Sequence, residues 1–272
     1  MKKQILYGIF SFLLGAMAFL GTHAYTEAIL YEKSTQELID QMDAKKLAEF
    51  QFKEFAEALS LGLYQNDKKK KLEKILASQE KHKILSQKYA LYTLSVLLVI
   101  LGSYFVVSLR AFSFFGSLAA LITLALGLIA PIMMVTIHKE VEYLGDVVLS
   151  FESKGVLGSI EKLLDGGDVI VAIVISLFSV IIPGVKTFSL LFVSVFMGNS
   201  FAHGVIKFFK MIGKWSMADV FVVATFLVYL TGNGSDVSRA EAEVGLYFFL
   251  GYVIVSMLVS LSADRMLYRL KK

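Results

Sequence analysis

Several apolar runs, each close to 20 residues long, constrain the fold of this 272-residue chain more than any other feature. A run of that length can cross the ~30 Å hydrocarbon core of a bilayer as an α-helix. Hydrophobic residues make up 56% of the chain and the mean hydropathy is +0.67, so too few polar residues remain to cover a water-facing surface. The sequence therefore predicts a mainly α-helical, polytopic membrane protein with about six transmembrane helices.

Short basic and short acidic segments alternate between these runs. Arg110, the connection 199–214 and the tail 266–272 are basic, whereas the connection 231–243 is acidic. Basic connections are retained in the cytoplasm, so the pattern predicts a multi-pass protein with a cytoplasmic C-terminus. The net charge of +4 reflects this topology, and we expect no nucleic-acid partner.

The first apolar run, residues 5–20, leaves two interpretations open. Lys2 and Lys3 precede it, and the small residue Ala24 follows it, which is compatible with a cleaved signal peptide or with an uncleaved anchor. We assign residues 1–30 to this signal peptide or signal anchor. In both cases the next segment begins on the extracytoplasmic side.

Residues 31–90 have the composition of soluble helices. Their apolar residues recur at spacings of three and four, and a polar stretch at 65–67 interrupts the pattern. This predicts an extracytoplasmic helical hairpin made of two amphipathic helices. We assign residues 91–113 to the next transmembrane helix, ending at 109, and its turn.

The periodicity changes after Pro131. Apolar residues alternate with polar ones from 135 to 143 and again from 147 to 151, on either side of a turn at 144–146. This alternation predicts a small extracytoplasmic β-hairpin. The apolar residues of 155–164 mark one face of a short helix, which we expect on the outer membrane surface.

The stretch 212–230 is typical of a helix that enters the membrane. Ser216 followed three residues later by Asp219 forms a capping-box pattern, which predicts a helix start. Lys214 and Trp215 stand just ahead of it, as interface anchors do. We therefore expect this helix to begin at the cytoplasmic edge of the membrane.

Lys186 lies inside an apolar run, where an ammonium group costs ~2.5 to 3.5 kcal/mol unless it finds a partner. At ~1.5 Å per residue it lies roughly 26 Å inward from Val169, at a depth similar to that of Asp219. We hypothesise that the two form an intramembrane polar pair. Supporting hydrogen-bond partners would be Ser216, Thr187 and Ser189. In the alternative interpretation, Asp219 only caps its helix and Lys186 extends to the lipid headgroups.

Both prolines of the chain lie in or beside an apolar run, and we interpret Pro131, Pro183 and Gly184 as helix breaks. These breaks could be hinges or static kinks. Cysteine is absent and the four histidines have no metal-ligand spacing, so we expect no metal and no cofactor. No nucleophile or acid pair is visible, and we expect no enzymatic activity.

Four stretches resemble the paraquat-inducible protein A family. They are residues 126–135 (LGLIAPIMMV), 155–191, 212–230 (IGKWSMADVFVVATFLVYL) and 245–264. The resemblance covers a domain at 114–265 and implies a four-span unit with a small extracytoplasmic sheet. Better-known members carry cysteine-rich zinc ribbons and two tandem copies of this unit, whereas this chain has one copy and no cysteine. A second copy would then come from a homodimer or another membrane subunit.

The resemblance also implies a function. Family members look like subunits in the bacterial inner membrane that take part in intermembrane phospholipid transport with a periplasmic protein carrying a mammalian-cell-entry (MCE) domain, so the resemblance implies the same location for this chain. Two alternatives stay open: a proton- or ion-coupled small-molecule transporter, favoured by intramembrane charge, and a sensor or scaffold subunit, favoured by the helical hairpin. No nucleotide-binding motif is present, so energy would come from a partner or from proton movement involving Asp219.

Overall fold

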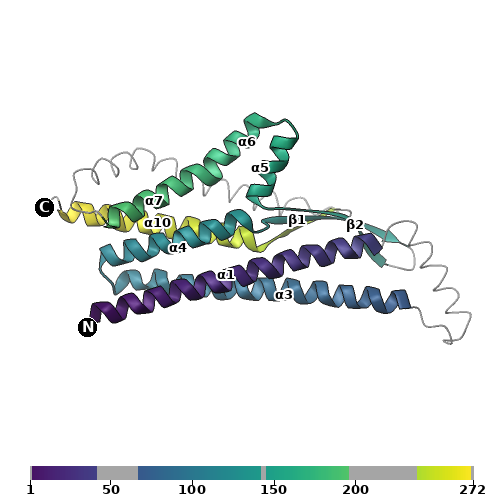
Figure 1. Ribbon diagram of the computed structural model, residues 1–272, viewed down its shortest axis with the longest axis horizontal. Coiled ribbons are helices and arrows are strands. Elements are labelled where there is room, and N and C mark those ends of the chain that lie inside the picture. Colours follow the sequence, from purple (N-terminus) through teal and green to yellow (C-terminus); the bar gives the residue numbers. More distant parts are fainter. Residues whose placement is uncertain (1, 42–66, 142–144, 196–237, 271–272) are drawn as a thin grey trace, which may run out of the picture.

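The computed structural model describes residues 2–41, 67–141, 145–195 and 238–270 (Figure 1). Five helices in this part of the chain are long and apolar enough to cross a membrane, and a small three-stranded sheet accompanies them. The predicted class, a mainly helical polytopic membrane protein with a small sheet, is confirmed. The sixth predicted span, which would follow Ser216, lies outside the described residues.

The two N-terminal helices, α1 (Lys2–Gln41) and α3 (Asp67–Gly102), lie antiparallel along each other (Figure 1). The 40 residues of α1 extend about 60 Å at ~1.5 Å per residue, twice the ~30 Å hydrocarbon core. The sequence predicted separate amphipathic helices beyond the membrane, whereas each helix continues from its apolar run without a break. Neither 22–41 nor 67–101 contains the glycine or proline that would end it. We call 25–41 and 67–90 the arm.

The turn after α3 lies earlier than the sequence predicted. α3 ends at Gly102, a 3₁₀ turn covers Ser103–Phe105, and α4 spans Leu109–Ile129. Ser108 begins α4 because its hydroxyl oxygen accepts a hydrogen bond from the backbone N–H of Ala111. Arg110, predicted to form the turn, therefore lies in the first turn of α4.

The sheet consists of β1 (Met133–Val141), β2 (Gly145–Lys154) and β3 (Ser238–Ala242), in the order β2-β1-β3 with antiparallel pairing. The predicted β-hairpin is confirmed. The third strand falls in a segment that the sequence predicted as an outer loop. Its five residues show no apolar alternation, and it pairs with β1 from more than 90 positions away, so local periodicity could not reveal it.

Three connections between helices and strands meet at the end of α4. β1 follows α4, β2 leads into α5 (Val156–Asp165) and β3 leads into α10 (Val244–Leu270). A Cβ atom on Gly245 would lie 2.5 Å from the carbonyl oxygen of Ala130 and 2.6 Å from that of Pro131. Only a residue without a side chain allows this close backbone approach, and the N–H of Gly245 donates to Pro131 O at 2.8 Å.

The segment Val169–Val195 is one long helical rod, made of α6 (Val169–Ser176), a π-helical stretch (Leu177–Ile181) and α7 (Ile182–Val195). Gly167, with φ of 84°, turns the chain between α5 and the rod. α7 packs on α4 and α10, whereas the α6 end leans away from them (Figure 1). Most α6 side chains are consequently exposed in the described part of the chain.

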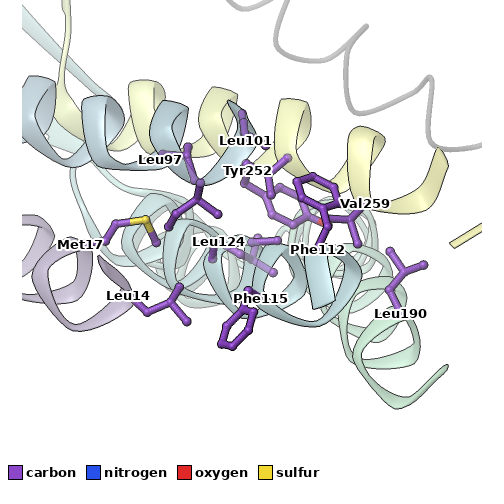
Figure 2. Packing of buried hydrophobic residues seen from close by; sticks show 14 of the residues in the cluster. Leu14, Met17, Leu97, Leu101, Phe112, Phe115, Leu124, Leu190, Tyr252 and Val259 are labelled. Atoms are coloured by element: carbon purple, nitrogen blue, oxygen red, sulfur yellow. The ribbon is translucent and has the colours of Figure 1, made fainter. Parts of the chain in front are cut away.

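The largest hydrophobic core joins α1, α3, α4, α7 and α10 (Figure 2). α4 approaches α10 closely through small residues: a Cβ atom on Gly127 would lie 2.8 Å from the backbone nitrogen of Phe249. The core side chains labelled in Figure 2 are Leu14, Met17, Leu97, Leu101, Phe112, Phe115, Leu124, Leu190, Tyr252 and Val259.

Candidate functional site

The candidate site is the contact between the first turn of α7 and the middle of α10. Lys186 and Thr187 of α7 are buried, with 8% and 0% of their surfaces exposed, and so are Tyr252 and Ser256 of α10. Tyr252 and Ser256 are four residues apart and therefore share one face of their helix. Four polar side chains, one of them charged, thus gather at one helix contact inside the bundle, and we call them the Lys186 cluster.

The ammonium group of Lys186 is held from the neighbouring helix. Its Nζ donates to the hydroxyl oxygen of Ser256 over 3.5 Å, and Lys186 has further interactions besides this one. Ser256 in turn donates to the carbonyl oxygen of Val253 at 3.1 Å. A distance of 3.5 Å is long for a hydrogen bond, so Ser256 alone does not compensate a buried charge.

The carbonyl oxygen of Pro183 organises the hydroxyl groups beside Lys186. It accepts from the hydroxyl of Thr187 at 2.8 Å and from that of Tyr252 at 3.0 Å, and these two hydroxyls lie 3.2 Å apart. Pro183 itself has no N–H and cannot complete the α-helical bond to residue 179. The π-helical stretch Leu177–Ile181 lies just before it, where such irregular turns often mark functional positions.

The predicted helix breaks differ in kind. At Pro183 the helix continues through the π-helical stretch, and Gly184 faces open space, since an added Cβ would meet nothing within 4 Å. Pro131 ends its span: α4 stops at Ile129, and Ala130 is extended (φ −75°, ψ 150°), as a residue before proline prefers. Pro131 is therefore the point where the membrane helix becomes a strand.

Two arginine side chains, Arg110 and Arg265, join helices at the end of the bundle that lies away from the sheet. Arg110 donates from Nε to Ser194 O at 3.1 Å and from Nη2 to Val195 O at 3.0 Å, so it binds the last two carbonyls of α7 that the structure describes. Arg265 of α10 donates to the hydroxyl of Tyr104, and its guanidinium lies 5.8 Å from that ring centre. Both chain ends lie at this end of the molecule, away from the sheet (Figure 1).

The structure brings together only some of the predicted site residues. Lys186 and Thr187 belong to the cluster, whereas Ser189 is half-buried and donates to Val185 O at 2.7 Å, away from it. The hypothesised partner Asp219, with the predicted residues Ser216, Lys214 and Trp215, lies outside the described residues, so the Lys186–Asp219 pair stays a prediction. Sequence reasoning missed Tyr252 and Ser256, although their four-residue spacing in an apolar run was a usable signal.

This arrangement can bind an anionic oxygen. A lysine ammonium carries three N–H donors, and charge-assisted hydrogen bonds to carboxylate or phosphate are the strong ones. Ser256 contacts the ammonium group, and the hydroxyls of Thr187 and Tyr252, which donate to the carbonyl oxygen of Pro183, keep lone pairs that can accept a hydrogen bond. Among the residues that the structure describes, no group of three or more histidine, aspartate and glutamate side chains could hold a metal ion.

The fold and the buried cluster define a multi-pass helical membrane protein with a polar site inside its helix bundle. A family model described as "Paraquat-inducible protein A" matches residues 113–269, more than half of the chain. The chain belongs to the paraquat-inducible protein A family. The match runs from α4 to α10 and includes the whole Lys186 cluster, whereas α1 and α3 precede it. No match was found among the curated proteins or the solved structures compared with it.

Proposed function

We propose that the protein is the inner-membrane subunit of a system that moves phospholipid between bacterial membranes together with a periplasmic MCE-domain protein. In this role it binds lipid and catalyses no covalent reaction. Membership of the paraquat-inducible protein A family supports a membrane component of the paraquat-inducible system. The lipid-handling role is argued from the geometry of the matched region.

The observation that carries the proposal is the buried ammonium group of Lys186. A lysine within an apolar span costs ~2.5 to 3.5 kcal/mol, so its presence points to a function rather than to stability. A phospholipid headgroup carries the phosphate oxygens that such a group binds. Pairing with Asp219 would give Lys186 a titratable partner. Protonation of Asp219 would leave the ammonium charge available to an anion, and deprotonation would restore the ion pair.

The rod Val169–Val195 supplies a surface suited to acyl chains. Ile170 and Phe188 on it are 80% and 62% exposed in the described part of the chain, and many of their neighbours are similarly open. Water would disfavour so large an apolar face, whereas hydrocarbon does not. Because α7 also carries Lys186, a lipid lying along the rod could present its tails to this face and its phosphate to the Lys186 cluster.

The sheet and the arm suit the docking of a periplasmic partner. They lie at one end of the molecule, and the start of α4 and the end of α10, which carry Arg110 and Arg265, lie at the other (Figure 1). The positive-inside rule then favours a cytoplasmic location for both chain ends and an extracytoplasmic location for the sheet and the arm. A partner in the periplasm would meet these elements first.

Lipid capture can be tested by extracting the protein with its surrounding membrane and identifying retained lipids by mass spectrometry. We expect bound phospholipid in the wild type and a several-fold loss in Lys186→Met. The matched control is Lys81→Met, which removes an exposed lysine of the arm and should retain the lipid. Equal lipid retention in both variants would remove the main support for the proposal.

Partner docking can be tested with a photo-crosslinking residue at one of two exposed apolar positions. Ile84 lies on the arm and is 55% exposed, whereas Phe105 lies at the opposite end and is 86% exposed. We expect crosslinks to an MCE-domain protein from Ile84 and none from Phe105. Lipid retention without such a crosslink would favour a different partner, and binding of a small ion or solute in place of lipid would favour the transporter alternative.

A further inference from the structure

The arm rests on the sheet through a second polar region, far along the chain from the Lys186 cluster. Its residues come from α1, α3, β2 and the segment around β3, and half of them carry a carboxyl group. We call this region the sheet–arm seam. It comprises Tyr31, Glu32, Lys83, Ser153, Glu241 and Glu243.

Strand pairing fixes one side of the seam. Ser153 lies opposite Met134, and Met134 lies opposite Glu241, so the three residues form one row across the sheet. Met134 is fully buried, which indicates that the middle of this row is covered. Lys83 reaches across from α3 and pairs with the carboxylate of Glu241. This face of the sheet is therefore in contact with the arm.

A small apolar cluster extends the contact from the sheet to the start of α10. Ala24 and Ala28 of α1 and Ala90 of α3 pack with Val244 and Phe248, the first residues of α10. Glu243 stands between this cluster and the strand. Its backbone N–H donates to Ile132 O at 2.9 Å, which fixes the chain where β3 becomes α10.

The carboxyl group of Glu243 is buried with little compensation. The residue is only 6% exposed, and burial is the largest influence on its carboxyl group. Its surroundings hold the carboxylates of Glu241 and Glu32, while the nearby cation Lys83 is already paired with Glu241. The N–H of Val244 supplies its one favourable backbone contact.

Burial and repulsion act in the same direction on this group. Burial first, and then the charge of Glu241, raise the pKa of Glu243 from its ordinary value of 4.5 to about 7. The seam is strained in a second way: the buried hydroxyl of Ser153 lies beside Glu32 but makes no hydrogen bond of ordinary geometry. A proton on Glu243 would remove one of the three negative charges gathered here.

We propose that Glu243 is a proton-binding site whose ionisation controls how firmly the arm sits on the sheet. The proposal rests on the seam alone and does not depend on phospholipid transport. When the arm is docked, Glu243 is enclosed; when the arm lifts, water reaches the carboxylate and restores its ordinary pKa. Because the docked state binds the proton more tightly, protonation favours docking.

The sign of the pH dependence follows from this linkage. The contribution of Glu243 to docking is fully present below its ordinary pKa and is lost as the pH rises through about 7. The other titratable and charged side chains around the seam must be considered as well. They are Glu32 and Tyr31 of α1, Lys83 of α3, Glu241 of β3, and the His82–Glu27 pair between α3 and α1, whose Nδ1 and Oε2 lie 2.6 Å apart. Arg239, also on β3, has a side chain outside those described.

The chain contains no cysteine, so spin labels can be placed at two chosen positions of the full-length protein. Leu76→Cys on the arm and Ser150→Cys on β2 replace exposed, uncharged residues. In lipid nanodiscs we expect one docked distance near pH 5, and a second, longer distance that grows as the pH rises to about 9. Each unit of pKa difference corresponds to about tenfold, so the docking equilibrium should shift at least about tenfold.

Three variants assign the effect. Glu243→Gln should keep the docked distance at every pH, whereas Glu37→Gln, an exposed carboxyl of the same arm, and His82→Gln should keep the wild-type pH dependence. The proposal is overturned by a pH-independent wild type, by an unchanged response in Glu243→Gln, or by loss of the response in His82→Gln. If Glu243→Gln does not fold, Glu243→Asp replaces it: a shifted midpoint supports the assignment and an unchanged midpoint overturns it.

Discussion

The hydroxyl group of Tyr252 donates a 3.0 Å hydrogen bond to the carbonyl oxygen of Pro183, and so joins the middle of α10 to the first turn of α7. The same carbonyl accepts from Thr187, the neighbour of Lys186 in sequence. This junction therefore sets the position of Lys186 relative to Ser256. Tyr252 also lies within the hydrophobic core beside the rings and aliphatic chains shown in Figure 2.

Tyr252→Phe tests this junction by removing one oxygen atom. The variant leaves Pro183 O with Thr187 as its remaining side-chain donor, so we expect a loss of about 0.5 to 1.5 kcal/mol in stability. Thermal unfolding in detergent, followed by circular dichroism, measures it. Tyr247→Phe is the matched control because Tyr247 lies on the same helix and is 41% exposed. If both variants unfold alike, the hydroxyl of Tyr252 does not join the helices.

Arg110→Gln tests the attachment of α7 to α4. Arg110 donates to the carbonyl oxygens of Ser194 and Val195, the last residues of α7 that the structure describes, and places its positive charge beside these oxygens. We expect faster hydrogen–deuterium exchange at the end of α7, around 190–195, corresponding to about 0.3 to 1 kcal/mol of local stability. Arg110→Lys should lose part of the protection because it keeps the charge without the two-point contact.

The exchange experiment carries its own reference region. Peptides from the first turns of α3, which lie at the other end of the molecule (Figure 1), should exchange at wild-type rates in both Arg110 variants. Acceleration spread evenly over the whole protein would mean that Arg110 supports the fold in general rather than the end of α7.

Gly245→Ala tests the crossing of the three connections. The new methyl group would lie within 2.6 Å of two carbonyl oxygens of the backbone, which cannot rotate away as a side chain could. Overpacking of this kind costs about 1 to 3 kcal/mol or more. Thermal unfolding measures the loss. In Gly158→Ala the methyl group meets nothing within 4 Å and lies within helix α5, so this control should be stabilised by about 0.5 to 1 kcal/mol.

Local patterns in the sequence were sufficient for elements whose signal is local. The apolar runs predicted the spans, the alternation after Pro131 predicted β1 and β2, and the apolar face of 155–164 predicted α5. The end of α3 was predicted several residues too late because the run stays apolar past Gly102, and the hydroxyl cap at Ser108 is a single weak signal. The length of α1 was missed because a polar sequence was interpreted as a new helix.

The site was less predictable because it depends on contacts between distant segments. Lys186 could be singled out from the sequence because a charge within an apolar run is energetically costly. The structure shows that this side chain is indeed buried. The four-residue spacing of Tyr252 and Ser256 puts them on one helix face, but it does not show that Tyr252 meets the carbonyl of Pro183 and Ser256 meets Lys186. In the sequence, Glu243 is one of the acids of the predicted outer loop. Only the structure shows that it is buried beneath the arm. Periodicity reports which face of an element is apolar and does not report what that face meets.

Glu152 of β2 holds α5 against the sheet through an ion pair with Lys162. Its carboxylate accepts from Lys162 of α5 and from Lys154 of β2, and these hydrogen bonds, the one from Lys162 first, lower the pKa of Glu152. A lowered pKa means that the stabilisation is present above the ordinary pKa of the acid and is lost as the pH falls through the lower value. All three groups are partly or largely exposed, so the contribution is small and screened by salt.

Glu152→Gln should therefore accelerate hydrogen–deuterium exchange of α5, residues 156–165, by no more than about tenfold at low salt. In about 1 M salt, where the screening length falls to ~3 Å, the variant and the wild type should exchange alike. Glu161→Gln removes another exposed carboxyl, on α5 itself, and should leave the exchange of α5 unchanged at both salt concentrations. An acceleration in Glu152→Gln that persists at high salt would show that Glu152 holds α5 through packing rather than through its charge.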